Sequence, residues 1–283
     1  MDIADLNANA PLAPGAPLEE KLARSRALLT ALCGLQPPQA VAVAYTGGKD
    51  SGVALALWRA ALADCAEVKA CADVKACAAL ADCADAKACA ALEEAGADVK
   101  SPLAACGGPL RALSVDTGLK FPQVTAFRDR LCAEWGVDLT IARPQVELNA
   151  YPVAQDKLAC CRDLKIAPLG RAMAETATTV LITGLRRDEH PSRAGRPYAE
   201  LRPATPLCPE HWQVNVILDW TEMDVWAFVT GEALPYCELY HEGYRSLGCM
   251  PCTRLAGAQA SERAGRDPDK ERQLESLKAL GYF

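Results

Sequence analysis

The sequence has no long apolar run and no excess of basic residues. No apolar run approaches the ~18 residues that a membrane-spanning helix needs. Residues 1–20 have neither the charged n-region nor the apolar h-region of a secretory signal. The net charge is −6, so no overall basic field attracts nucleic acid or an anionic membrane. We therefore expect a cytoplasmic protein that binds neither nucleic acid nor a membrane. Residues 1–20 are expected to form a flexible tail, and the sequence leaves open whether the protein is a homo-oligomer.

Two common nucleotide-binding motifs are also missing. No Gly-x-Gly-x-x-Gly follows a strand, which argues against nicotinamide or flavin chemistry. The Walker A motif is absent because Gly47 and Gly48 are adjacent, where that motif needs several intervening residues.

What is present is typical of a globular domain with a sizeable core. The chain has 283 residues, of which 51% are hydrophobic and 23% charged. Its fourteen cysteines indicate metal or redox chemistry, since a cytosolic chain of this length rarely uses disulfides.

Strands alternate with helices along the chain. We expect strands at 39–45, 111–116, 137–144, 179–185 and 212–220, and helices at 21–35, 121–136, 162–177 and 221–231. This order predicts an α/β fold: a mostly parallel twisted sheet with helices on both faces, in a Rossmann-like three-layer arrangement. Ligands bind at the carboxyl ends of the strands in such sheets.

A cysteine repeat interrupts this order. Five cysteines recur every six residues: Cys65, Cys71, Cys77, Cys83 and Cys89. On a helix, six residues advance by ~600°, so successive cysteines point to different faces and do not converge on one metal. We therefore predict a Cys/Ala-rich helical insert at about 63–106 without a metal site.

The stretch YTGGKDSG directly follows the predicted strand at 39–45. Glycines after a strand let the backbone approach an anion, and the following helix offers N–H groups. Lys49 can neutralise phosphate charge, and Ser51 can donate a hydrogen bond. This pattern predicts an anion-binding loop.

Two cysteine pairs form a second candidate site. Cys160 and Cys161 are adjacent, and Cys249 and Cys252 form a Cys-x-x-Cys pair. Four thiolates are typical of zinc or of an iron–sulfur cluster, and the spacing leaves the two open.

These motifs resemble a known family. TGGKDS is similar to the Ser-Gly-Gly-x-Asp-Ser loop of the PP-loop, or adenine nucleotide α-hydrolase-like, superfamily. CC…CxxC, SVDTGLKFPQ, CCRDLKIAPL and TGLRRDEHPSRA resemble segments of the assimilatory adenylyl-sulfate (APS) and phosphoadenylyl-sulfate (PAPS) reductases. The resemblance covers a domain at 21–255 apart from the insert. It implies thiol-dependent reduction of activated sulfate to sulfite and AMP or PAP in sulfur assimilation.

The resemblance also implies ligands and residue roles. The substrate would be an adenine sulfonucleotide, and the donor thioredoxin or glutaredoxin. A 4Fe-4S cluster would be bound by Cys160, Cys161, Cys249 and Cys252. The nucleotide-binding residues would be Thr46, Gly47, Gly48, Lys49, Asp50, Ser51, Asp116, Thr117, Gly118, Arg186, Arg187 and Arg193.

The C-terminal part departs from this pattern. The family's nucleophile is a cysteine in a C-terminal Glu-Cys-Gly-x-His segment, and no cysteine follows Cys252. Residues 256–283, predicted to form a helical tail, instead resemble the end of the small subunit of the heterodimeric sulfate adenylyltransferase.

Three alternatives follow from this departure. The protein is a reductase that uses Cys237, Cys208 or an external thiol. Otherwise it is an adenylyltransferase that cleaves ATP between the α- and β-phosphates with Mg²⁺, or a non-catalytic nucleotide-binding iron–sulfur protein.

Overall fold

The strands form one six-stranded sheet. The computed structural model describes residues 2–8, 10–13, 15–79, 108–257 and 260–281, and for 67–79 it describes the backbone alone. The strand order is β3-β2-β1-β4-β6-β5. All neighbouring pairs are parallel except β5 with β6. The strands are β1 (Val41–Ala44), β2 (Arg111–Val115), β3 (Asp138–Ala142), β4 (Val180–Thr183), β5 (Ala199–Arg202) and β6 (His211–Asn215). The predicted mostly parallel α/β sheet is confirmed.

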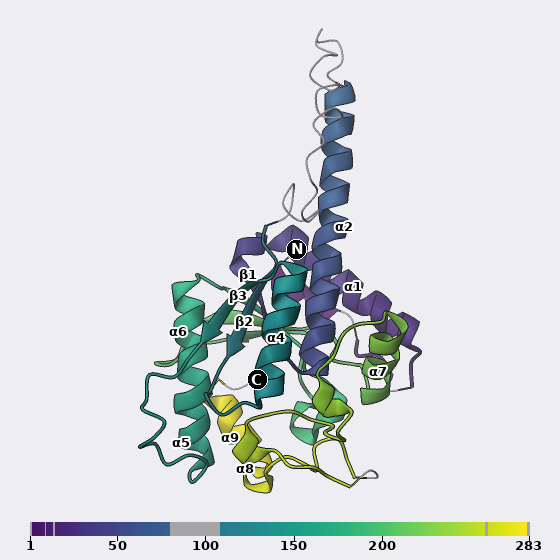
Figure 1. Ribbon diagram of the computed structural model, residues 1–283. Helices are drawn as coiled ribbons and strands as arrows, with labels where there is room; N and C mark the ends of the chain where they lie inside the picture. The colour runs from purple at the N-terminus through teal and green to yellow at the C-terminus, as the bar shows by residue number, and fades with distance from the viewer. Residues whose placement is uncertain (1, 9, 14, 80–107, 258–259, 282–283) are drawn as a thin grey trace.

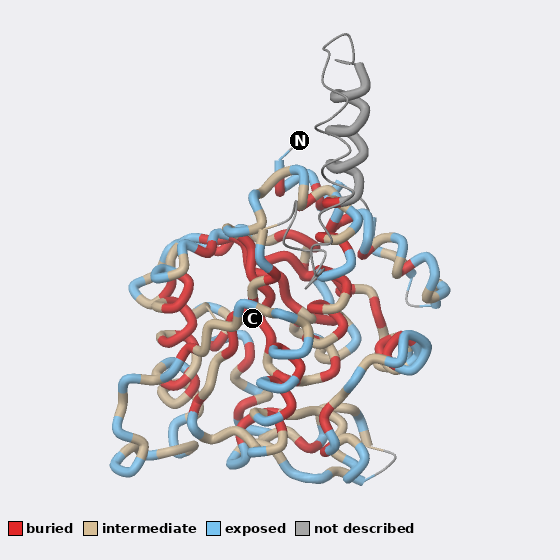
Figure 2. The backbone as a smooth tube through the Cα atoms, turned by 45° about the horizontal axis from the view of Figure 1, so that its top comes forward, coloured by how far each residue is buried: buried red, intermediate tan, exposed pale blue. Residues whose placement is uncertain are grey.

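Helices cover both faces of the sheet. Alternate residues of β1 point to opposite faces, as the pleat of a strand requires: Val43 joins the core beneath α1, α2, α4 and α7, and Ala42 joins the core beneath α6. Buried residues accordingly gather along the middle of the molecule (Figure 2). The helices are α1 (Leu18–Leu35), α2 (Lys49–Ala79), α4 (Pro122–Trp135), α5 (Lys157–Cys161), α6 (Ala167–Glu175), α7 (Glu222–Gly231), α8 (Pro268–Arg272) and α9 (Leu274–Ala279).

Helix α2 begins in the glycine-rich loop and projects well beyond the sheet (Figure 1). It therefore runs into the predicted insert at 63–106 and includes Cys65, Cys71 and Cys77 of the repeat. Cys83 and Cys89 lie outside the described residues, so the divergence of the five thiols stays a prediction.

The N-terminal segment is packed against the sheet, so the prediction of a flexible tail over 1–20 was wrong for residues 3–8. A 3-10 helix at Ile3–Ala8 buries Ile3 and Leu6 in the main core. The Asn7 side chain donates to Ala199 O at 2.7 Å and accepts from Ala199 N at 2.9 Å. These bonds cover β5, an antiparallel edge strand that the sequence analysis missed, and edge strands otherwise present unpaired backbone groups.

The C-terminal segment folds back onto the helix that carries the adjacent cysteines. In the predicted helical tail at 256–283, the residues that the structure describes form two short helices, α8 and α9. Leu274 and Leu277 pack against Cys161. The predicted helix at 162–177 begins earlier, in α5, and a π-helical turn at Arg162–Ile166 joins α5 to α6. The predicted strand at 212–220 ends at Asn215.

Within the described ranges, no helix combines the length and apolar character needed to cross a bilayer.

Candidate active site at the carboxyl edge of the sheet

The glycine-rich loop lies where the strand order reverses. Strand β1 pairs with β2 on one side and with β4 on the other, and open α/β sheets bind ligands at such a switch point. Gly47 has φ +81°, and a Cβ there would lie 3.0 Å from Val124 O. A Cβ on Gly184, just after β4, would lie 2.6 Å from Asp50 O. Only glycine at these positions lets the start of α2 pack this closely on α4 and β4.

A cavity of about 170 Å³ opens beside the loop. Thr46, Gly48, Asp50 and Ser51 line it from the loop, and Thr117, which follows β2, lines it as well. Five cationic side chains from four segments line it: Lys120, Lys165, Arg193, Arg263 and Arg266. A concave site with this many cations favours an anionic ligand.

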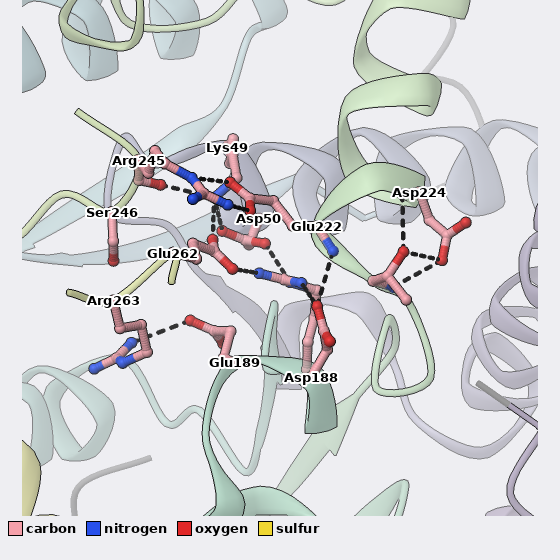
Figure 3. Close-up of polar contacts among 12 residues, drawn as sticks. Lys49, Asp50, Asp188, Glu189, Glu222, Asp224, Arg245, Ser246, Glu262 and Arg263 are labelled. Carbon is pink, nitrogen blue, oxygen red and sulfur yellow. Dashed lines mark hydrogen bonds and ion pairs between the residues drawn. The ribbon is translucent and has the colours of Figure 1, made fainter. Parts of the chain in front are cut away.

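Lys49 and Arg186 do not line this cavity. They are 3% and 0% exposed and belong to a buried ion-pair network with Asp50 and Glu262 (Figure 3). Lys49 Nζ contacts a Glu262 oxygen and donates to Arg245 O at 3.0 Å. Arg186 Nε donates to Asp50 Oδ1 at 2.6 Å, and its Nη2 contacts the other Glu262 oxygen.

The charges in this network depend on one another. Burial alone would lower the pKa of Lys49 and of Arg186, but Asp50 and Glu262 outweigh it and raise both pKa values. Both cations therefore hold their charge because carboxylates neutralise them, and the network binds the C-terminal segment to the loop.

The remaining residues predicted to bind nucleotide are divided between the cavity and its surroundings. Arg193 lines the cavity and pairs with Glu189. Arg187 instead pairs with Asp219 and donates to Arg196 O at 2.8 Å. Asp116 accepts from Gly118 N at 3.0 Å, and neither residue lines the cavity.

Sequence reasoning missed Arg263 and Arg266 as cavity residues. Arg263 pairs with Glu189 at 3.1 Å and Glu271 at 2.7 Å. Arg266 Nη2 donates to Leu247 O at 2.7 Å. Their signal was the run SERAGR at 261–266, which lies in the segment that resembles the end of the sulfate adenylyltransferase small subunit.

The four predicted ligand cysteines line a second, smaller cavity. Cys160 and Cys161 reach it from α5, and Cys249 and Cys252 reach it from the turn at Met250–Cys252. Burial, followed by the charges of the three other thiols, raises the pKa of Cys160. Burial also acts to raise the pKa of Cys249, but Lys165, Lys120 and the Thr117 hydroxyl outweigh it and lower it to about 6.

Four thiols around one cavity are a donor set that suits an iron–sulfur cluster or a zinc ion. Among the residues whose side chains are described, no three His, Cys, Asp or Glu residues are already placed to hold a metal ion. A 4Fe-4S cluster binds one thiolate at each iron, which spreads its four cysteines around a larger body. The π-helical turn directly after Cys161 is a form common at functional sites.

The two candidate nucleophiles do not reach the cavity. Cys208 and Cys237 are 6% and 1% exposed, and neither lines it. Burial raises the pKa of both thiols, which keeps them protonated near neutral pH. Neither has the environment of an activated thiol.

Comparison with known proteins identifies the family. Residues 40–255, more than half of the chain, match the model of the phosphoadenosine phosphosulfate reductase domain. The chain belongs to this family. It is 32% identical over 169 residues to an adenosine 5′-phosphosulfate reductase of Agrobacterium fabrum, in a match that covers 56% of this chain and 63% of the relative. The chain therefore spans less than two thirds of that relative's length.

Solved structures share the fold. Yeast FAD synthetase in complex with FAD aligns with a TM-score of 0.59 at 17% identity, over 90% of this chain and 72% of the other. A phosphoadenylyl-sulfate reductase from Candida auris aligns with a TM-score of 0.51 at 17% identity, over 81% and 96%. Identities this low support the fold and not the activity.

Proposed function

We propose that the protein is an iron–sulfur sulfonucleotide reductase that binds adenylyl sulfate in the cationic cavity and reduces its sulfate group with thiols. One observation carries this proposal: the cationic cavity and the four-cysteine cavity adjoin. Lys165 lines both cavities. Thr117 lines the first, and its hydroxyl lies 3.3 Å from the Cys249 sulfur. The chain's membership of the reductase family supports the same reading.

The lining of the cavity suits each part of such a substrate. Val115, Leu169 and Leu185 supply apolar surface against which an adenine ring packs. Arg266 supplies a planar guanidinium for phosphate or sulfate oxygens, and Lys120 and Lys165 supply compact positive charges. These cations stabilise charge that develops on the leaving phosphate during reaction.

The reaction balances with two thiols. A thiolate attacks the sulfur of the sulfate group, the bond from that sulfur to the AMP oxygen breaks, and AMP leaves with the electron pair. The first thiol then carries the sulfonate. A second thiolate attacks the sulfur of the first thiol, forms a disulfide and releases sulfite with the electron pair. Two thiols are oxidised and one sulfate is reduced.

The thiols come from a donor protein of the thioredoxin or glutaredoxin class. Among the cysteines whose side chains are described, Cys208 and Cys237 are buried away from the cavity, and the four that line the adjoining cavity are those that would hold the cluster. Bound there, a 4Fe-4S cluster would fix the shared wall and add charge near the substrate anion.

The variant Lys165→Gln tests the proposal through binding. We expect adenylyl sulfate to bind at least tenfold more weakly by titration calorimetry, since a charged hydrogen bond contributes roughly 1.5–3 kcal/mol. Arg26→Gln, an exposed site on α1, is the control and should bind as the parent does. Equal affinity in all three proteins would contradict the proposed site.

A further inference from the structure

The carboxylate of Glu262 contacts Lys49, the lysine of the glycine-rich loop. One carboxylate oxygen contacts Lys49 Nζ and the other contacts Arg186 Nη2 (Figure 3). The side chain is 8% exposed, so this bridge is buried. Glu262 lies between the Cys249–Cys252 pair and α8, and the described residues from 260 to the start of α8 form no helix.

A second side chain accepts a hydrogen bond from the backbone N–H of Lys49. The Tyr240 hydroxyl accepts a hydrogen bond from Lys49 N at 2.9 Å, and the ring centroid lies 5.6 Å from Lys49 Nζ. Both the side chain and the backbone N–H of the loop lysine are therefore engaged by residues of the C-terminal part of the chain. A phosphate at this lysine would have to displace them.

The charge around Lys49 opposes a further anion. Three carboxylates, Asp50, Asp188 and Glu262, pair with Lys49 and Arg186 in the described part of the chain. Burial, with added repulsion from Asp50 and Glu189, raises the pKa of Glu262. Lys120, Lys165 and Arg266 line the cavity with positive charge, here called the Lys120–Lys165–Arg266 wall, and Lys165 also lines the cysteine cavity. An anionic group is therefore favoured at that wall and disfavoured at the loop lysine.

We propose that Glu262 determines specificity by keeping the loop cations from holding the pyrophosphate of ATP. The cavity then selects nucleotides whose anionic end fits the Lys120–Lys165–Arg266 wall, as adenylyl sulfate does, because that ligand has no pyrophosphate. The inference rests on the proposed function for the identity of the favoured ligand. On this proposal the Glu262 carboxylate determines whether the protein binds a sulfonucleotide or ATP.

The test measures binding of inorganic pyrophosphate, ATP and adenylyl sulfate to the full chain by titration calorimetry, with and without Mg²⁺. We expect the parent to bind pyrophosphate more weakly than about 1 mM. Glu262→Gln should bind pyrophosphate and ATP at least tenfold more tightly than the parent and adenylyl sulfate within a few-fold of it. Glu275→Gln removes an exposed carboxylate from the same tail and should match the parent, and Glu262→Asp keeps the charge and should show little gain.

Each outcome decides the inference. A folded Glu262→Gln protein without a gain in pyrophosphate affinity would overturn it. So would tight pyrophosphate binding by the parent that persists in Lys165→Gln, because the loop cations would then hold the pyrophosphate. If Glu262→Gln gains pyrophosphate affinity but neither protein binds adenylyl sulfate, the role of Glu262 stands and the proposed reductase function fails.

Discussion

Replacing Lys49 by methionine tests whether the loop lysine is part of a buried charge network. The change keeps the length of the side chain and removes the charge. Because the Lys49 side chain is 1% exposed, its loss leaves Asp50 and Glu262 with Arg186 as their one cation in the network. Breaking a buried ion pair by removing one partner costs about 3–5 kcal/mol.

The expected change in melting temperature follows from this figure. A domain of this size loses roughly 2–4 °C for each kcal/mol. Lys49→Met should therefore melt about 10 °C below the parent at neutral pH by circular dichroism. Loss of Glu262 as well should restore part of the difference, since the double variant removes the uncompensated carboxylate.

A double-mutant cycle measures the interaction directly. We expect a coupling free energy of about 1–3 kcal/mol between Lys49→Met and Glu262→Gln. Additive effects, within about 0.5 kcal/mol, would refute the buried pair and return Lys49 to the role of a ligand contact.

Three further predictions follow from named contacts. Gly184→Ala should destabilise the fold by about 1–3 kcal/mol in urea titrations, because its Cβ would lie 2.6 Å from Asp50 O, whereas Gly195→Ala, with nothing within 4 Å, should be neutral. Burial alone would raise the pKa of Asp224, but hydrogen bonds from Lys21 and Thr221 lower it. The ionised carboxylate therefore stabilises the fold at pH values above the ordinary aspartate pKa, and this stabilisation is lost as the pH falls through the pKa of the folded state. Asp224→Asn should thus lower the melting temperature at about pH 7 and much less at about pH 3; an equal loss at both would contradict the ion pair. Cys249→Ser should lose the iron of anaerobically purified protein while Cys237→Ser keeps it, and full iron in both would exclude the proposed cluster ligands.

The sequence located the parts of the site that have local patterns. A buried strand followed by adjacent glycines predicted the loop, and the spacing of Cys160–Cys161 and Cys249–Cys252 predicted ligands that do line one cavity. Strand and helix positions followed from apolar periodicity, and the parallel sheet followed from their alternation. These features depend on residues that are close in the chain.

The parts that were missed depend on contacts between distant residues. Lys49 and Glu262 are 213 positions apart, so the motif around Lys49 carries no sign that a carboxylate neutralises it. Arg187 and Arg193 share one motif, yet only Arg193 faces the cavity. The N-terminal segment has an acidic, Pro/Ala-rich composition, and its residues Ile3 and Leu6 are buried where it docks.

The most direct test of the account is anaerobic turnover of adenylyl sulfate by the iron-loaded protein with reduced thioredoxin. Sulfite, AMP and oxidised thioredoxin would be measured in the same samples, with ATP replacing adenylyl sulfate in a parallel set. The account predicts equal amounts of sulfite and AMP, dependent on thioredoxin, and no pyrophosphate from ATP. Absence of sulfite with release of pyrophosphate from ATP would contradict it and identify an adenylylating enzyme built on the same scaffold.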